Sequence, residues 1–167
     1  MKDLIAKLDT MKRRAIFFAA ILMSFILGQA QESNFVPEQS VAFKKKEGKI
    51  LLKQCSRPSP ARTITGYFDL DEEDILSLEQ NFRKLLTLSC NCPYEKISDL
   101  ESYGYQYLGV KRGTRNYIYI NAVHMGMLRG NDKIQSPIRI CDGGRSAWGV
   151  LYDLEREDFF ELAINGF

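Results

Sequence analysis

The sequence predicts an α+β fold, in which one amphipathic helix packs on an antiparallel meander sheet of about five strands. Three observations support this class. Between residues 70 and 88, apolar side chains recur every three or four positions, the period of a helix with one buried face. From residue 103 onward the period changes to two, which is typical of strands. Short turns separate these alternating segments, and hairpins with short turns give an antiparallel sheet.

The composition fits one globular domain. The chain has 167 residues, of which 45% are hydrophobic and 26% are charged, and this excludes a disordered protein. The 23 basic and 21 acidic residues are unevenly placed, because residues 31–167 hold 18 basic and 19 acidic ones. A near-neutral body lacks the basic surplus of a nucleic-acid-binding protein, so no nucleic acid is expected as a partner.

The N-terminus has the pattern of a secretory signal peptide. Basic residues 12–14 precede the uncharged apolar run 15–28, which reaches about 21 Å as a helix, short of the roughly 30 Å hydrocarbon core. Small residues at 28 and 30 fit cleavage after Ala30. We therefore expect residues 1–30 to be removed and the protein to be exported to the periplasm or the extracellular space, without a stable membrane span after cleavage. An uncleaved anchor or a buried helix is the alternative, and Met11 is a second possible start.

Residues 31–60 are expected to be a lead-in segment, followed by a single α+β domain at 61–167. The lead-in holds three of the five prolines and a lysine run at 44–46. A hairpin over 41–52 is one interpretation of this region, but a solvated loop is favoured. Three lysines beside a near-neutral body do not indicate an anionic partner.

The four cysteines, Cys55, Cys90, Cys92 and Cys141, all follow the predicted signal peptide. An even count in an oxidising compartment predicts two disulfides. One intervening residue is expected to strain a direct bond between Cys90 and Cys92, so each should pair with Cys55 or Cys141, in either of two connectivities. A single CxC lacks the spacing typical of zinc sites and of redox pairs, and no metal or cofactor is predicted.

The predicted helix begins with a capping box. Asp69 and Glu72 have the required spacing, and the acidic residues that follow match the helix dipole. One buried stripe is predicted along the helix. Its members are Ile75, Leu78, Phe82, Leu85 and Leu86.

A tyrosine-rich hairpin follows, with its turn within residues 111–115. A three-residue loop ending at Gly113 would place Tyr107 opposite Tyr117 and gather the tyrosines on one face, whereas a two-residue loop would divide them. We expect the three-residue loop and an exposed face that binds a partner through rigid rings. The alternative is a second core layer under residues 31–60. The predicted binding face consists of Tyr103, Tyr105, Tyr107, Tyr117, Tyr119 and Arg115.

Further strands are expected at 63–68, 137–141, 147–152 and 159–164. This order, with one helix before a run of hairpins, resembles that of cystatin-like and PepSY-like domains, which implies a helix on a curled antiparallel sheet and no particular function. The C-terminal pattern CDGG…WGVxYD…F…L…NG resembles the end of small uncharacterised secreted bacterial proteins. That resemblance implies export and a shared fold. The only tryptophan, Trp148, is expected in the core.

No catalytic residue is assigned. His124 and Cys141 would form a nucleophilic pair only with a free thiol, and a disulfide is expected instead. Asp142, Asp153 and Glu161 are the carboxylates available for acid–base chemistry, yet each fits a turn or an outward strand position. The sequence therefore favours an exported, non-enzymatic binding domain for a protein, peptide or saccharide. A small extracytoplasmic hydrolase and an accessory subunit of an envelope assembly are the alternatives.

Overall fold

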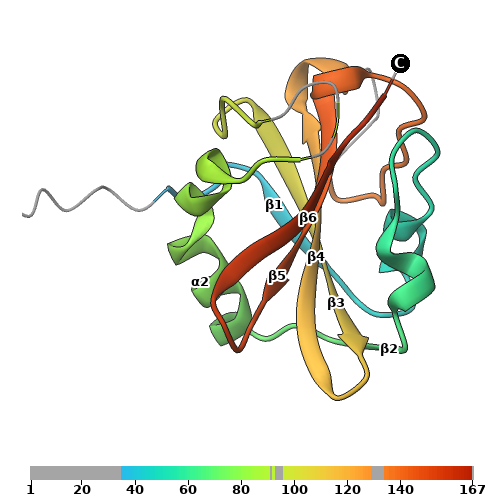
Figure 1. Ribbon diagram of the computed structural model, residues 1–167, viewed down its shortest axis with the longest axis vertical. Helices are drawn as coiled ribbons and strands as arrows, with labels where there is room; N and C mark the ends of the chain where they lie inside the picture. The colour runs from blue at the N-terminus through green and yellow to red at the C-terminus, as the bar shows by residue number, and fades with distance from the viewer. Residues whose placement is uncertain (1–34, 91, 93–95, 129–133, 167) are drawn as a thin grey trace, which may run out of the picture. The chain divides into compact units, whose positions relative to one another are not determined.

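A mixed sheet of six strands forms the centre of the protein in a computed structural model, which describes residues 35–90, 92, 96–128 and 134–166 (Figure 1). These residues belong to one unit, Asn34–Phe167. The strands are β1 (Ser40–Phe43), β2 (Gly66–Phe68), β3 (Tyr103–Arg112), β4 (Arg115–His124), β5 (Ala147–Asp153) and β6 (Asp158–Ile164). The helical elements are α2 (Glu72–Gln80) and the 3-10 segments η1 (Gly48–Leu52), η2 (Pro60–Thr63), η3 (Phe82–Thr87), η4 (Met125–Met127) and η5 (Gly144–Ser146).

The predicted α+β class is confirmed, but the sheet is not wholly antiparallel. Its order is β1-β3-β4-β5-β6, with β2 also paired to β3. The pairs from β3 to β6 are antiparallel, whereas β1 runs parallel to β3. Parallel pairing needs a long crossover, and the chain between β1 and β3 supplies it through η1, β2 and α2. Part of the predicted lead-in is therefore a strand of the sheet.

The strand expected at 137–141 does not form, because its backbone groups bond to side chains instead. The Ile138 amide donates to Gln106 Oε1 at 3.0 Å, and its carbonyl accepts from Asn121 Nδ2 at 3.1 Å. The Ile140 amide donates to Gln54 Oε1 at 3.0 Å. Buried backbone groups need hydrogen-bonding partners. Here the side-chain amides of Gln54, Gln106 and Asn121 supply them in place of a neighbouring strand.

The helical region is divided rather than being one helix over 70–88. The α-helix starts two residues later than expected, with a capping box between Asp71 and Asp74, and η3 follows it after Asn81. The predicted stripe still faces the sheet, since Leu78, Phe82 and Leu85 are fully buried. Ile75 and Leu86 are partly buried and pack against the same cluster.

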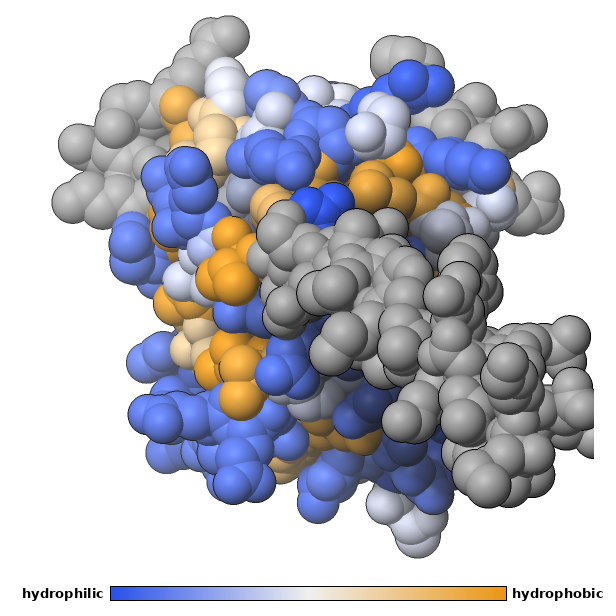
Figure 2. All heavy atoms as spheres, turned by 90° about the vertical axis from the view of Figure 1, so that its left-hand side faces the viewer, coloured by the Kyte–Doolittle hydropathy of each residue, from blue (hydrophilic) through white to orange (hydrophobic). Residues whose placement is uncertain are grey.

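The outer surface of α2 is mixed in character. Leu76 is 58% exposed on this helix. The helix itself lies on the side of the molecule that Figure 2 presents. Apolar side chains on that face lie among hydrophilic ones (Figure 2). Scattered exposed apolar residues are normal for a soluble domain.

The hairpin turn between β3 and β4 contains two residues, not three. Arg112 pairs with Arg115 across it, and Tyr107 lies opposite Ile120. Gly113 has φ 59°, which suits the first position of a two-residue hairpin turn. The prediction of a three-residue loop was wrong, since one glycine with positive φ is compatible with either loop length.

This register places the tyrosines on both faces of the sheet. Tyr105 and Tyr107 belong to the cluster under α2 and η3, whereas Tyr117 and Tyr119 belong to a second cluster with Phe43, Leu51 and Leu52. All four are at most 7% exposed, and Tyr103 is partly buried. The predicted exposed tyrosine face is therefore absent. The alternative of a second core layer is correct for Tyr117 and Tyr119, and Trp148, 1% exposed, is confirmed as core.

The disulfides also differ from the prediction. Cys55 is paired with Cys141, and Cys90 with Cys92. The Cα atoms of Cys90 and Cys92 are 5.3 Å apart, within the normal range for a disulfide, so one intervening residue does not exclude the bond. The bond between Cys55 and Cys141 links the lead-in to the loop before β5 across 86 positions.

A buried arginine joins the lead-in to the sheet. Arg57 is 6% exposed, and it donates to Asn165 Oδ1 at 2.8 Å, to Tyr119 Oη at 3.1 Å and to Asn121 Oδ1. A Cβ atom on Gly149 would lie 2.6 Å from Tyr119 Oη and 3.1 Å from Arg57 Nε. Glycine is thus required there for the hydroxyl and the guanidinium to approach β5.

The predicted signal peptide lies outside the described residues. Within the described ranges, no helix is long and apolar enough to cross a membrane. Phe35, at the start of these ranges, packs on Phe82 with ring centroids 5.7 Å apart.

Replacing Phe82 by Asp should unfold the domain, because an unpaired charge would enter the fully buried cluster under η3. Glu73→Ala is the matched control on the exposed side of α2, and should change the free energy of unfolding by less than about 1 kcal/mol. Thermal melts followed by circular dichroism measure both effects. A soluble, cooperatively folding Phe82→Asp variant would show that another surface of the helical region is buried.

The domain should lose stability in alkali through two buried tyrosines. Burial raises the pKa of Tyr105 and Tyr107 above the usual 10.0. Below about pH 10 both the folded and the unfolded chain keep the phenolic protons, so these tyrosines do not lower the free energy of unfolding. Above it the unfolded chain releases them first, and stability falls by about 1.4 kcal/mol per tyrosine and pH unit. Denaturant titrations from about pH 8 to about pH 11 test this, and Tyr105→Phe should show a shallower slope. An equal slope would exclude Tyr105 as a source of the loss.

Candidate functional site

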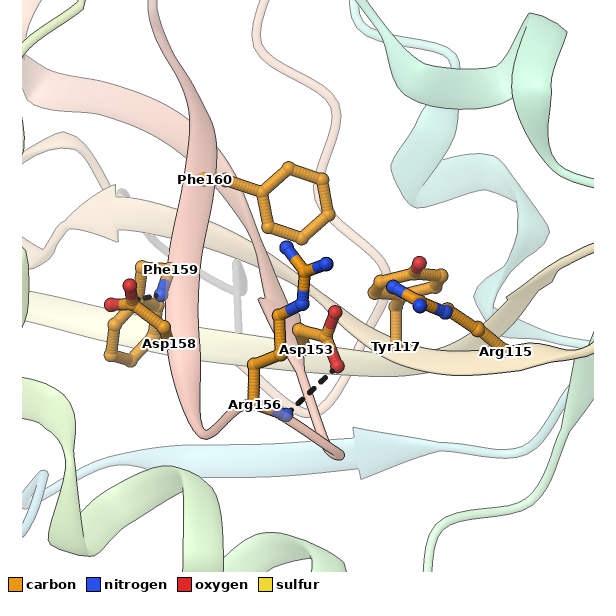
Figure 3. A pocket seen from close by; sticks show the side chains of 7 residues that line it. All are labelled: Arg115, Tyr117, Asp153, Arg156, Asp158, Phe159 and Phe160. Carbon is orange, nitrogen blue, oxygen red and sulfur yellow. Dashed lines mark hydrogen bonds between the residues drawn. The ribbon is translucent and has the colours of Figure 1, made fainter.

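A small hollow lies beside the β5–β6 turn, at the end of the sheet where the β3–β4 turn also lies (Figures 1 and 3). Its volume is about 150 Å³. Cavities of that size hold a single six-membered ring. The lining residues are Arg115, Tyr117, Asp153, Arg156, Asp158, Phe159 and Phe160.

The lining side chains fall into two groups. Figure 3 shows Phe160, Arg156, Asp153, Tyr117 and Arg115 gathered on one side of β6. Asp158 and Phe159 lie on its other side, where Phe159 belongs to the cluster under α2. The first group therefore determines which ligand groups the hollow can bind.

Two aromatic rings form one wall. The Tyr117 and Phe160 rings are 5.5 Å apart at 65°, an edge-to-face arrangement. The Arg112 guanidinium lies 5.9 Å from the first ring and 5.6 Å from the second. Glu161 holds that guanidinium with two charge-assisted bonds of 2.7 and 2.6 Å. Arg112 is thus paired with Glu161 and held close to both rings.

The other two arginines are weakly engaged. Arg115 Nε lies 3.7 Å from Glu155 Oε2, and the two side chains are 46% and 73% exposed, so this pair contributes little. Arg156 is exposed, and its guanidinium makes no hydrogen bond or ion pair with another described residue. The hollow thus presents one guanidinium without a partner among the described residues, that of Arg156, and one in a weak, solvent-exposed ion pair, that of Arg115.

Asp153 shapes the base of the hollow. It is 4% exposed, and its Oδ1 accepts from the amides of Glu155 at 2.9 Å and Arg156 at 3.1 Å. These bonds are typical of an aspartate that closes a turn on its own backbone. Both of these bonds go to Oδ1, so Oδ2 is the remaining acceptor of this lining carboxylate among the described residues.

Two residues with unusual backbone geometry flank the hollow. Glu157 and Glu161 have φ values of 52° and 54°, a region that side-chain-bearing residues rarely adopt. The Lys84 ammonium donates to the Glu157 carbonyl at 2.7 Å, and Arg112 holds Glu161. The register of β5 and β6 also shifts between Gly149 and Leu151. Such irregular backbone is frequent beside binding and active sites.

Of the predicted binding face, only Tyr117 and Arg115 line this hollow. Sequence reasoning missed Arg156 and Phe160, because 153–158 reads as a charged turn and Phe160 as one residue of the strand predicted at 159–164. The signal that would have found them is the position of two Arg- and aromatic-containing turns, 111–117 and 153–160, at one end of an antiparallel sheet.

The candidate catalytic groups are not assembled. Cys141 is bonded to Cys55, so it offers no thiol to His124, whose Nδ1 accepts from the Gly126 amide at 3.0 Å. Among Asp142, Asp153 and Glu161, only Asp153 lines the hollow. No group of three or more metal-ligating side chains occurs among the residues described here.

Comparisons with known proteins give no relative. No family model matches the chain, and neither a curated protein nor a solved structure shows significant similarity to it. The resemblances drawn from the sequence therefore stay predictions.

Asp153→Ala should destabilise the domain by about 1–3 kcal/mol, since two amides of the β5–β6 turn would lose their acceptor beside a buried position. Asp158→Ala is the matched control at the other end of the turn, where the side chain is exposed, and should cost less than about 1 kcal/mol. Urea titrations measure both. Equal effects would show that Asp153 does not hold the turn.

Proposed function

We propose that the protein is an exported binding domain whose hollow at the β5–β6 turn holds one residue of an acidic saccharide. The observation that carries this proposal is the Arg156 guanidinium, which has no partner among the described residues and lines the same hollow as two aromatic rings and Asp153. Export rests on the predicted signal peptide, and disulfides are the kind of bond that persists outside the cytoplasm.

Each part of the hollow matches one feature of a uronic acid. Arg156 and Arg115 offer forked donors, which suit a planar carboxylate. Tyr117 and Phe160 offer an apolar wall for one face of a sugar ring. Asp153 Oδ2 offers an acceptor for a ring hydroxyl.

An acidic peptide side chain matches fewer of these features. Its carboxylate would satisfy the arginines, but it brings no ring to the aromatic wall and no hydroxyl to Asp153. A neutral hexose would meet the wall and Asp153 while leaving the arginines without an anion. The ring-sized volume, the aromatic wall and the two arginines together favour a sugar that carries a carboxylate.

The test is titration of the purified protein with the methyl glycosides of glucuronate and galacturonate, followed by NMR chemical shifts. The neutral methyl glycosides of glucose and galactose are the ligand controls. Arg156→Ala should weaken uronate binding about tenfold or more, since a charge-assisted bond is lost. Arg139→Ala, an exposed arginine that does not line the hollow, should leave affinity unchanged.

Added salt should weaken the same binding, because the arginines act partly through exposed charge. Equal affinity for neutral and acidic glycosides would contradict the proposal. So would shifts confined to residues away from the β5–β6 turn, or equal effects of the two arginine variants.

A further inference from the structure

A second hollow adjoins the proposed uronate site and shares one residue with it. Its volume is about 550 Å³, and Arg115 lines both hollows. The second hollow lies between the start of α2, the β3–β4 turn and the β5–β6 turn. Its lining residues are Asp74, Thr114, Arg115, Asn116, Leu154 and Glu155. A ligand longer than one sugar residue therefore has a place to continue.

The second hollow carries a net negative charge, whereas the arginines and carboxylates that line the first are equal in number. Asp74 and Glu155 line it, and Arg115 is its only lining cation. Asp71 and Glu73 at the start of α2 act electrostatically on Asp74. Partial burial raises the pKa of Asp74, a hydrogen bond from the Asp71 amide opposes that rise, and the charges of Asp71 and Glu73 add to it. The Glu155 carboxylate is 73% exposed, and its only described ion-pair partner is Arg115, at 3.7 Å.

The remaining lining groups suit a hydroxylated ring. Thr114 supplies a hydroxyl and Asn116 an amide, which together can donate and accept. Leu154, partly buried, gives a small apolar contact. A second uronate here would meet two carboxylates, whereas a cationic group would satisfy them.

From these contrasts we infer that the ligand spans both hollows as a disaccharide unit, with a uronic acid beside Arg156 and a hexosamine bearing a free amino group beside Asp74 and Glu155. This inference rests on the proposed function. It adds that the recognised chain alternates in charge and that Arg115 lies where its two sugar units meet.

The experiment compares three ligands on the full exported chain by calorimetry. They are a uronate–hexosamine disaccharide with a free amine, the same disaccharide N-acetylated, and a diuronate. The free-amine disaccharide should bind about tenfold more tightly than the uronate monosaccharide, since the second hollow adds its contacts. The diuronate should gain nothing over the monosaccharide, because like charges meet in the second hollow.

Variants separate the two hollows. Asp74→Asn keeps a hydrogen-bonding side chain at the third position of the capping box and removes the charge, so it should lower affinity for the free-amine disaccharide about threefold or more. It should leave affinity for the uronate monosaccharide unchanged. Glu38→Gln, an exposed carboxylate that lines neither hollow, is the control and should have no effect on either ligand.

The outcomes distinguish the inference from the proposal beneath it. If the uronate monosaccharide binds but the free-amine disaccharide binds no better than the N-acetylated one or the diuronate, the inference fails and the proposed function stands. An Asp74→Asn variant with normal disaccharide affinity would also overturn the inference. If no uronate ligand binds, both fail.

Discussion

The two-residue turn at Gly113 and Thr114 is the constraint on which the rest of the structure depends. By pairing Arg112 with Arg115 it sets the parity of the central hairpin, and parity decides which face every side chain of β3 and β4 reaches. Tyr105 and Tyr107 are directed toward α2 and η3, while Tyr117 is directed to the opposite face. The same turn holds Arg112 and Arg115 beside the Tyr117 ring, where the candidate site forms. A hairpin one residue longer would place that ring on the other face.

Neutral oxygens, not carboxylates, hold the buried guanidinium of Arg57 among the described residues. Desolvation of a cation is costly, and the three hydrogen bonds that Arg57 donates to acceptors on β4 and on the residue after β6 offset that cost. Removing one acceptor would leave a donor unpaired in the interior, which is more costly than the bond itself was favourable. The arrangement fixes residue 57, and with it the lead-in, over the second face of the sheet. Burial of Tyr117 and Tyr119 depends on that cover.

Local features of the fold could be predicted from the sequence, and nonlocal ones could not. The stripe of Leu78, Phe82 and Leu85 followed from periodicity within one segment, and the interior place of Trp148 followed from its apolar neighbours. Parallel pairing of β1 depends on residues 65 positions away, and no local pattern encodes it. The candidate site could not be predicted, because it depends on nonlocal contacts and its residues have no distinctive local pattern. Its residues come from two turns that meet only after the meander folds, and Arg156 is by itself an ordinary turn residue.

The parallel pairing of β1 with β3 also has a consequence for the order in which the chain folds. Ser40 pairs with Tyr105, and Cys55 is bonded to Cys141, so the early part of the chain gains its main partners only when the late part is present. Contacts so distant in sequence carry a large loop-closure cost, which delays them relative to the local hairpins from β3 to β6. During synthesis from the N-terminus, residues 40–55 therefore emerge long before they have anything to pack against.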